Sequence, residues 1–239
     1  MKLTLRLLLV TALFTSALVA SAIPGRAVVT GVTGTASVTS ASGVTKPLLK
    51  DAVLGQGDTI STGAGSTAVL WLGLNGDGLI LDVDTTVKLE VLDIVHIGNR
   101  TVNTRLLVIK GRILGDVVTK MTAASKYEMT NGKAGGQVTG TQYAFKADGT
   151  IIVIEGTVRF GYIPAGQTTM VYVTVTRDQS YTPGAAAAVT ASEADLNGAN
   201  RLLASGMATF YSLINHRGEV VRSATQTANP LDTSVSALD

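Results

Sequence analysis

The pattern of apolar and polar positions predicts an all-β domain over residues 27–177. Short stretches rich in Val, Ile and Thr recur along this region, and glycine-containing turns separate them. One such stretch, TAVLWL, places Ala68, Leu70 and Leu72 on the same face of a strand. This period of two favours half-buried strands over helices.

The same period predicts strands through most of the domain. In residues 87–92, Val87, Leu89 and Val91 face one way, while Lys88 and Glu90 face the other. Further strands are predicted at 104–109, 112–118, 150–154, 157–161 and 169–176. Asn-Gly or Asp-Gly pairs at 75–76, 131–132 and 148–149 supply the positive φ of short turns. Many short strands of this kind build a sandwich, a barrel or an irregular β-solenoid, and periodicity does not choose among them.

A different period follows Pro183 and predicts a helix over 192–215. Ser192 is the expected N-cap, after a linker at 178–191. Apolar residues then recur at spacings of three and four and form one helix face. We expect this face to dock either on the β domain, where it would cover one end of the stacked β-strands, or on a partner protein. The residues of this docking face are Leu196, Leu203, Met207, Phe210 and Ile214. The remaining residues, 216–239, have few large apolar side chains and predict a disordered, flexible tail.

Residues 1–22 have the pattern of a secretory signal peptide. Lys2 and Arg6 form a basic start, residues 7–20 are mainly apolar, and small residues precede an expected cleavage site after Ala22. An uncleaved membrane anchor is the alternative, but the apolar run is shorter than the ~20 residues that a spanning helix needs. We therefore expect export to the periplasm, the cell surface or the medium, with no membrane span after cleavage.

Charge and composition exclude several classes of function. Lys2 and Arg6 account for the whole net charge of +2, so the rest of the chain is neutral, which argues against nucleic acid as a partner. The chain has no cysteine, which excludes disulfides, thiolate metal sites and thiol nucleophiles. The two histidines, His96 and His216, have no partner at ligand spacing. We expect no catalytic residue, no metal and no cofactor.

Residues 79–86 contain the Asp-x-Asp-x-Thr string of haloacid-dehalogenase-type phosphotransferases. Those enzymes need a parallel α/β sheet, whereas the residues that follow here alternate like an antiparallel strand. We therefore interpret the segment as a strand in which Asp82 and Asp84 face solvent. Leu81 and Val83 are then expected to face the core.

Two other short motifs have a chemical and a structural interpretation. Residues 75–78 (NGDG) bring Asp77 near Asp82 and Asp84, and clustered carboxylates can bind Ca²⁺. A hairpin turn is the ordinary alternative, because no ligand pattern repeats. Residues 63–67 (GAGST) resemble part of a phosphate loop but lack its Gly-Lys-Ser/Thr ending, so a polar turn is favoured.

Two ordered groups of residues resemble the signatures of the FecR domain family. The opening group lies in LGQGDTISTGAGSTAVLWL (54–72), and its matched positions are Gly57, Asp58, Thr62 and Gly63. The closing group has the elements V-x-GT-x-aromatic and V-x-EG-x-V, matched at Gly140, Thr141, Tyr143, Glu155 and Gly156. The resemblance covers about residues 32–161, although the Thr-Pro that the family usually shows before the Gly-Thr element is absent here. It implies an FecR-like β fold, which we expect to be an irregular, elongated β-solenoid or a sandwich of many short strands.

The signature residues also have a direct structural interpretation. Gly57 and Gly63 are expected at backbone positions closed to other residues, and Asp58 is expected to accept hydrogen bonds from the amides of its own turn. Gly140 and Gly156 are expected to begin strands where a side chain would crowd a neighbouring turn. We therefore interpret these residues as determinants of the fold and not as a ligand site.

The resemblance implies a role in the bacterial cell envelope. FecR proteins of the iron-regulation type link a cytoplasmic segment that controls a sigma factor to a periplasmic domain that senses a receptor. Because this chain begins directly with a signal-peptide pattern, we expect a non-enzymatic exported FecR-domain protein that binds a protein partner or acts as a scaffold. The alternatives are a subunit of a self-associating surface assembly, since long strand edges can pair, and a periplasmic sensor of receptor-linked iron uptake.

Overall fold

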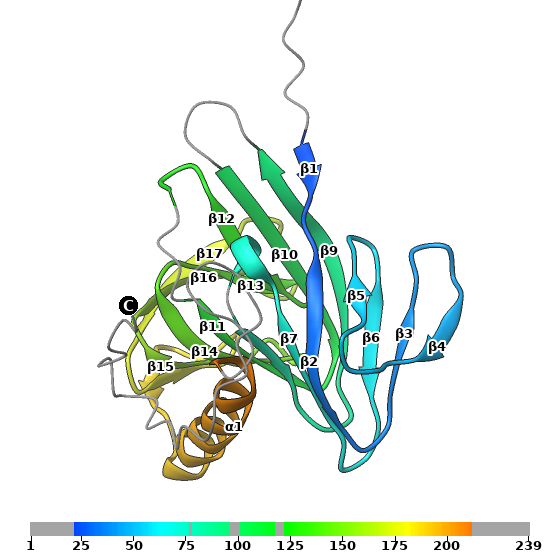
Figure 1. Cartoon of the computed structure of the whole chain (residues 1–239). Coiled ribbons are helices and arrows are strands. Elements are labelled where there is room, and N and C mark those ends of the chain that lie inside the picture. Colours follow the sequence, from blue (N-terminus) through cyan, green and yellow to red (C-terminus); the bar gives the residue numbers. More distant parts are fainter. Residues whose placement is uncertain (1–21, 77, 96–100, 118–121, 212–239) are drawn as a thin grey trace, which may run out of the picture.

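Two β-sheets pack face to face and enclose most of the buried side chains (Figure 1). The computed structural model describes residues 22–76, 78–95, 101–117 and 122–211. The predicted signal peptide up to residue 21 and the predicted tail at 216–239 therefore lie outside the described residues. The all-β prediction is confirmed, and of the expected architectures the two facing sheets correspond to a sandwich.

The first sheet, called sheet A, has ten strands in the order β17-β16-β13-β12-β10-β9-β6-β3-β4, with β1 paired to β9 beside this path. All neighbours are antiparallel except β10 and β12. Its strands are β1 (Ala22–Pro24), β3 (Ala36–Thr39), β4 (Thr45–Pro47), β6 (Thr59–Thr62), β9 (Thr86–Val95), β10 (Thr101–Lys110), β12 (Lys126–Thr130), β13 (Ala134–Val138), β16 (Thr157–Tyr162) and β17 (Val171–Thr176).

The second sheet, called sheet B, has nine strands in the order β19-β18-β15-β14-β11-β8-β7-β2-β5, all antiparallel. Its strands are β2 (Ala27–Thr33), β5 (Val53–Leu54), β7 (Thr67–Trp71), β8 (Gly78–Leu81), β11 (Arg112–Val117), β14 (Thr141–Lys146), β15 (Ile151–Glu155), β18 (Gln179–Tyr181) and β19 (Val189–Thr190). A short 3-10 helix, η1 (Gly73–Asn75), connects β7 to β8.

The core between the sheets forms because each strand turns one row of apolar side chains inward. Ala68, Leu70 and Leu72, predicted to share a face, are all buried there. The strands predicted from residue 104 to residue 176 are confirmed as β10, β11, β15, β16 and β17, with boundaries shifted by a few residues. The turn glycines Gly132 and Gly149 have φ of +91° and +92°, as their Asn-Gly and Asp-Gly pairs predict.

A β-bulge in β9 overturns one detail of the predicted alternation. Arg105 pairs with Val91 and the next residue, Leu106, pairs with Leu89, so Glu90 is the extra residue. Beyond the bulge the inward face shifts by one position. Leu92 is therefore buried, and Val91, predicted to share the face of Val87 and Leu89, is only half-buried.

The predicted C-terminal helix is α1 (Glu193–Tyr211). Ser192 caps it, since the Ser192 hydroxyl accepts a hydrogen bond from the amide of Asp195 at 3.1 Å. The segment before it, predicted as a linker at 178–191, contains β18 and β19, because Gln179–Tyr181 pairs with β15 and extends sheet B. No helix in the described ranges is both long enough and apolar enough to cross a bilayer.

Helix α1 lies against the outer face of sheet B, not at the end of the stack as expected (Figure 1). Ala199 and Leu203 are buried there and Leu196 is half-buried. They pack on Val69, Ile80, Leu114, Ala144, Ile152 and Ile154, which project from the face of sheet B opposite to the core. The side chains of Met207 and Phe210 and the whole of Ile214 lie outside the described part of the chain.

Candidate functional site

A groove of about 230 Å³ lies on the outer face of sheet A, over β12, β13, β16 and β17. The contacts of α1 are with strands of sheet B, so the helix does not cover this face. The groove is lined by Arg105, Glu128, Met129, Thr130, Gly132, Lys133, Ala134, Gly135, Gly136, Gln137, Arg159, Gly161, Ile163, Met170 and Tyr172. Backbone pairing explains how these residues come together.

Two glycines at facing positions form the floor of the groove. Strand register places Thr130, Gly135, Gly161 and Tyr172 in one row across β12, β13, β16 and β17. Gly135 and Gly161 have no side chain to rise from the sheet, so the row is hollow between Thr130 and Tyr172. A Cβ atom on Gly161 would lie 2.9 Å from the sulfur of Met170 and from a ring carbon of Tyr172. The groove therefore depends on glycine at this position.

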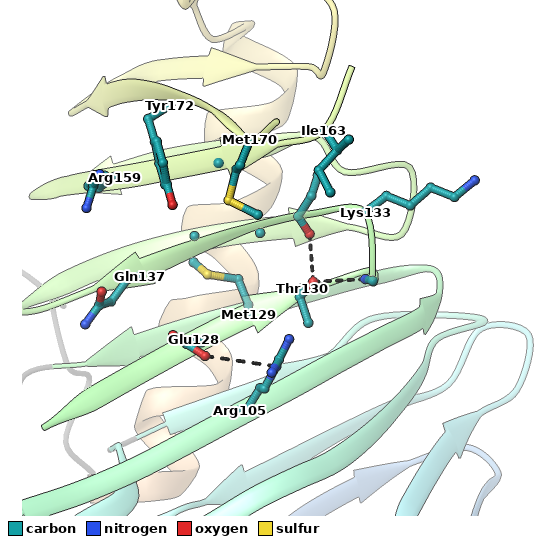
Figure 2. Close-up of a pocket in the computed structure, with 15 residues that line it drawn as sticks. Arg105, Glu128, Met129, Thr130, Lys133, Gln137, Arg159, Ile163, Met170 and Tyr172 are labelled. Atoms are coloured by element: carbon teal, nitrogen blue, oxygen red, sulfur yellow. Dashed lines mark hydrogen bonds and ion pairs between the residues drawn. The ribbon is translucent and has the colours of Figure 1, made fainter. Parts of the chain in front are cut away.

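Exposed apolar side chains form the wall on the β17 side. Ile163, Met170 and Tyr172 are 41%, 45% and 53% exposed, which is unusual for large apolar residues gathered in one place. Figure 2 shows these three along one side of the groove, with Thr130, Glu128 and Arg105 along the other. This wall is therefore an exposed apolar surface that is not packed into the core of the domain.

The next row across the sheet is polar and places an arginine at one end of the groove. Glu128, Gln137, Arg159 and Thr174 are paired across β12, β13, β16 and β17. The guanidinium of Arg159 stacks on the ring of Tyr172, 4.0 Å from the ring centroid. Within the described ranges Arg159 forms no ion pair, so its charge is available to a ligand.

The other two cations at the groove differ from Arg159. Arg105 is already paired, with Glu90 at 3.4 Å and with Glu128 at 4.0 Å. It reaches both carboxylates because β10 lies between β9 and β12: Arg105 faces the bulge in β9 that contains Glu90, and it is paired with Glu128 of β12. The side chain of Lys133 extends away from the groove in Figure 2. The arrangement can therefore hold an apolar or planar group on the glycine floor and a carboxylate at Arg159.

The opening signature residues lie in a different region, around β6. The carboxylate of Asp58 accepts hydrogen bonds from the amides of Gly55 at 2.8 Å and Ala41 at 3.2 Å, which ties its own turn to the β3–β4 turn. Gly57 has φ of +90°, as expected for a position closed to other residues. Gly63 lacks such a φ, and glycine is needed there because a Cβ would lie 2.8 Å from the hydroxyl of Thr35.

Thr62 completes this region by joining two turns. Its hydroxyl donates to the carbonyl of Asp82 at 2.6 Å and accepts from the amide of Thr85 at 3.0 Å. These bonds hold the end of β6 to the turn after β8. The opening signature is thus a set of turn contacts, and none of its four residues lines the groove.

The closing signature residues lie where β14 and β15 meet. Gly156 has φ of +89°, and a Cβ there would lie 2.7 Å from the carbonyl oxygen of Gly140, so the expected crowding is present. Gly140 has open space around it and is required by its φ of +62° instead. The hydroxyl of Thr141 donates to the carbonyl oxygens of Thr139 and Thr157. Glu155 is exposed, and Tyr143 is buried in the core.

The carboxylates considered for Ca²⁺ are engaged in ion pairs. Asp82 lies in a turn, where its carboxylate accepts from the Nε of Arg112 at 2.8 Å, and Asp84 lies 3.8 Å from the ammonium of Lys110. Asp84 has φ of +50° and Val83 is 43% exposed, so the predicted strand over 79–86 ends at Leu81 and Val83 does not face the core. Asp77 lies outside the described residues, and those described contain no group of three acidic or histidine side chains that could hold a metal.

Sequence reasoning did not find the groove. Its signal is present in KAGGQV and RFGYI, where a glycine occupies an outward position of each strand. The hollow forms only because β13 and β16 pair with Gly135 directly beside Gly161. That pairing joins residues 26 positions apart and cannot be inferred from alternation within either strand.

Comparisons with known proteins give limited results. The chain matches no family model and no curated protein, so the FecR resemblance stays a prediction. A crystal structure of a candidate anti-sigma factor from Parabacteroides distasonis at 2.50 Å is similar over 58% of this chain, with 12% identity and a TM-score of 0.42; the chain covers 62% of that structure. A second such structure from the same organism, at 1.65 Å, is similar over 64% of this chain and 74% of its own length, with 11% identity and a TM-score of 0.42.

Proposed function

We propose that this chain is a non-enzymatic, exported binding module of the cell envelope, and that the groove on sheet A is its binding site. The observation that carries the proposal is the glycine floor formed by Gly135 and Gly161, flanked by exposed Met170 and Tyr172 and by Arg159. The resemblance to FecR domains and the signal-peptide pattern support the location. Apolar anchors beside an arginine are typical of protein-binding surfaces.

The ligand that fits this surface is a segment of a partner protein that presents an apolar side chain next to a carboxylate. The apolar side chain would rest on the glycine floor against Met170 and Ile163. The carboxylate would pair with Arg159, whose planar guanidinium is already oriented by the ring of Tyr172. A groove of about 230 Å³ holds one or two side chains and is too small for most cofactors.

A pair of charge reversals tests the proposal. Arg159→Glu and Lys133→Glu make the same change of charge at exposed cations on one groove, but only Arg159 stacks on the groove wall, since Lys133 points away (Figure 2). We expect the mature protein to capture an envelope protein from its own organism, Arg159→Glu to weaken capture by about tenfold or more, and Lys133→Glu to leave it nearly unchanged.

Thermal melting of both variants controls for folding. Equal effects of the two substitutions on capture would contradict the groove as the binding site. A third variant, Gly161→Ala, adds a methyl group to the floor and should also weaken capture, because the flexible ends of Met170 and Tyr172 must move into the groove.

Self-association is a second candidate function, and the exposed edge of β17 favours it. The six residues of this strand carry no charge, and among the described strands none pairs with its outer edge. A sensor role in receptor-linked iron uptake follows only from the family resemblance. It would require that the captured protein be such a receptor.

A further inference from the structure

The end strands of the two sheets differ greatly in how well they are protected against pairing with another chain. Sheet A ends in β17 and β4, and sheet B ends in β19 and β5. Strand β4 has three residues and includes Lys46 and Pro47, while β5 and β19 have two residues each. Short strands, lysine and proline are the devices by which proteins block sheet edges. By contrast, β17 is the six-residue sequence VYVTVT, with neither charge nor proline.

The backbone of β17 points unused hydrogen-bonding groups away from the sheet. The amide of Thr176 donates to the side-chain oxygen of Gln179 at 3.0 Å and so faces away from β16. Since N–H and C=O directions alternate along a strand, those of Tyr172 and Thr174 face the same way. In the described part of the chain no acceptor or donor satisfies them. Gln179 therefore satisfies the outward amide of Thr176, and the outward backbone groups of Tyr172 and Thr174 stay open to a partner strand.

We propose that β17 pairs antiparallel with β17 of a second copy of this chain, with Val173 of both copies at the twofold axis. In this register Tyr172 lies opposite Thr174 of the second copy, and the two residues exchange both of their N–H···O bonds. The reciprocal pair does the same. Thr176 keeps its bond to Gln179 and needs no partner. This assigns an interface to the second candidate function, on which the inference rests.

Side-chain chemistry favours a second copy as the occupant. The cross-strand pair of Tyr172 with Thr174 joins an aromatic to a β-branched side chain, a combination that stabilises antiparallel pairs. On the inner side Val171 faces Val175, so both residues are apolar. Because β17 has no charged side chain, two copies of it can pair without electrostatic repulsion. The nearest unpaired cation, Arg159, lies on β16, so the two copies of it are separated by three strand spacings, about 14 Å or more, beyond the ~8 Å screening length.

The proposed pairing ends at a dimer. Joining two β17 edges leaves β4 as the end strand of sheet A at both ends of the combined sheet, and β4 is blocked by Lys46 and Pro47. The symmetry is closed, so the chain would not polymerise through this surface. On the outer face the row that runs through Gly135, Gly161 and Tyr172 would continue into Thr174 of the second copy, placing each groove beside the interface.

Single cysteines test the register directly, because the natural chain has no cysteine. Val173→Cys should form a disulfide-linked dimer under mild oxidation, since facing residues of a non-hydrogen-bonded pair bring their Cα atoms to about 4.5 Å. Val171→Cys is the matched control on the same strand and face. Its two copies would lie about 14 Å apart, so it should stay monomeric on a non-reducing gel. Crosslinking of Val171→Cys without Val173→Cys would overturn the register.

Light scattering on the purified mature protein tests the dimer itself. We expect a concentration-dependent dimer that Thr174→Pro weakens by about tenfold or more, because proline removes an outward N–H while the inward bonds to β16 are kept. Thr174→Ala keeps the N–H and should remain dimeric. A wild-type protein that is monomeric up to millimolar concentration, with no Val173→Cys crosslink, would overturn the proposal. The Arg159→Glu variant should still dimerise, so failure of the groove proposal and failure of this one are distinguishable.

Discussion

The hydroxyl groups of Tyr143 and Tyr127 lie 3.1 Å apart in the buried core, where Tyr143 donates to Tyr127. Tyr143 belongs to β14 of sheet B and Tyr127 to β12 of sheet A, so this bond connects the two sheets. Their rings meet edge to face, with centroids 6.2 Å apart. Gly115 makes the contact possible, since a Cβ there would lie 2.3 Å from the ring of Tyr143.

Removing this hydroxyl should destabilise the protein without changing its shape. We expect Tyr143→Phe to lower the free energy of unfolding by about 1 to 2 kcal/mol, because a buried hydrogen bond is lost while the ring packing is kept. Urea denaturation at pH 7 measures the change. Tyr172→Phe, at an exposed position, is the control and should have little effect.

Because Tyr143 is buried, the stability of the protein should fall at alkaline pH. Burial raises the pKa of Tyr143 well above 10.0, and the neighbouring Tyr127 adds to this effect. Above pH 10 the unfolded chain loses this proton while the native state retains it, so stability should fall as pH rises. Denaturation curves between pH 9 and 11 should show a shallower decline for Tyr143→Phe. Burial also raises the pKa of Tyr181 to about 12, and that contribution should persist in the variant.

Helix docking should weaken at acid pH. A hydrogen bond from Ser192 lowers the pKa of Asp195 below 3.8, and Lys146, 3.2 Å away on β14, acts in the same direction. A depressed carboxyl pKa contributes stability above pH ~4 that is lost as pH falls through the native value. Asp195→Asn should therefore reduce the acid dependence of unfolding between pH 5 and 2. An unchanged slope in this variant would contradict the role of Asp195.

Helix α1 should be an integral part of the stability of the β domain. Leu203 is buried against sheet B, so Leu203→Ala should cost about 2 to 4 kcal/mol and Leu203→Asp more. Asn200→Asp places the same charge on the exposed side of the helix and is the matched control. Equal melting temperatures for Leu203→Asp and Asn200→Asp would show that the helix does not stabilise the domain.

Replacing glycine by alanine should have opposite effects on stability at two positions. Gly156→Ala should destabilise by about 1 to 3 kcal/mol, because its φ is +89° and a Cβ would lie 2.7 Å from the carbonyl oxygen of Gly140. Gly198→Ala lies within α1 with open space around its Cβ and should stabilise by up to about 1 kcal/mol. Denaturation of both variants under identical conditions gives the comparison.

Most of the fold follows from local patterns in the sequence. Alternating apolar residues specify strands because side chains on a strand point to opposite faces in turn, and this rule alone located β7, β10, β11, β15, β16 and β17. The apolar spacing and the cap at Ser192 located α1. Such features involve residues within one element, so the sequence by itself determined them.

Long-range pairing decided the rest. The bulge at Glu90 reversed the face of Val91 because β9 had to match its partner β10. The strand predicted through Val83 ends at Leu81, because the chain turns there with Asp84 at φ of +50°. The groove exists only because sheet register sets Gly135 beside Gly161, and the open edge only because β17 ends its sheet. These properties depend on which strands become neighbours. A single strand's pattern carries no information on that choice, since burial of apolar faces is satisfied by many strand orders.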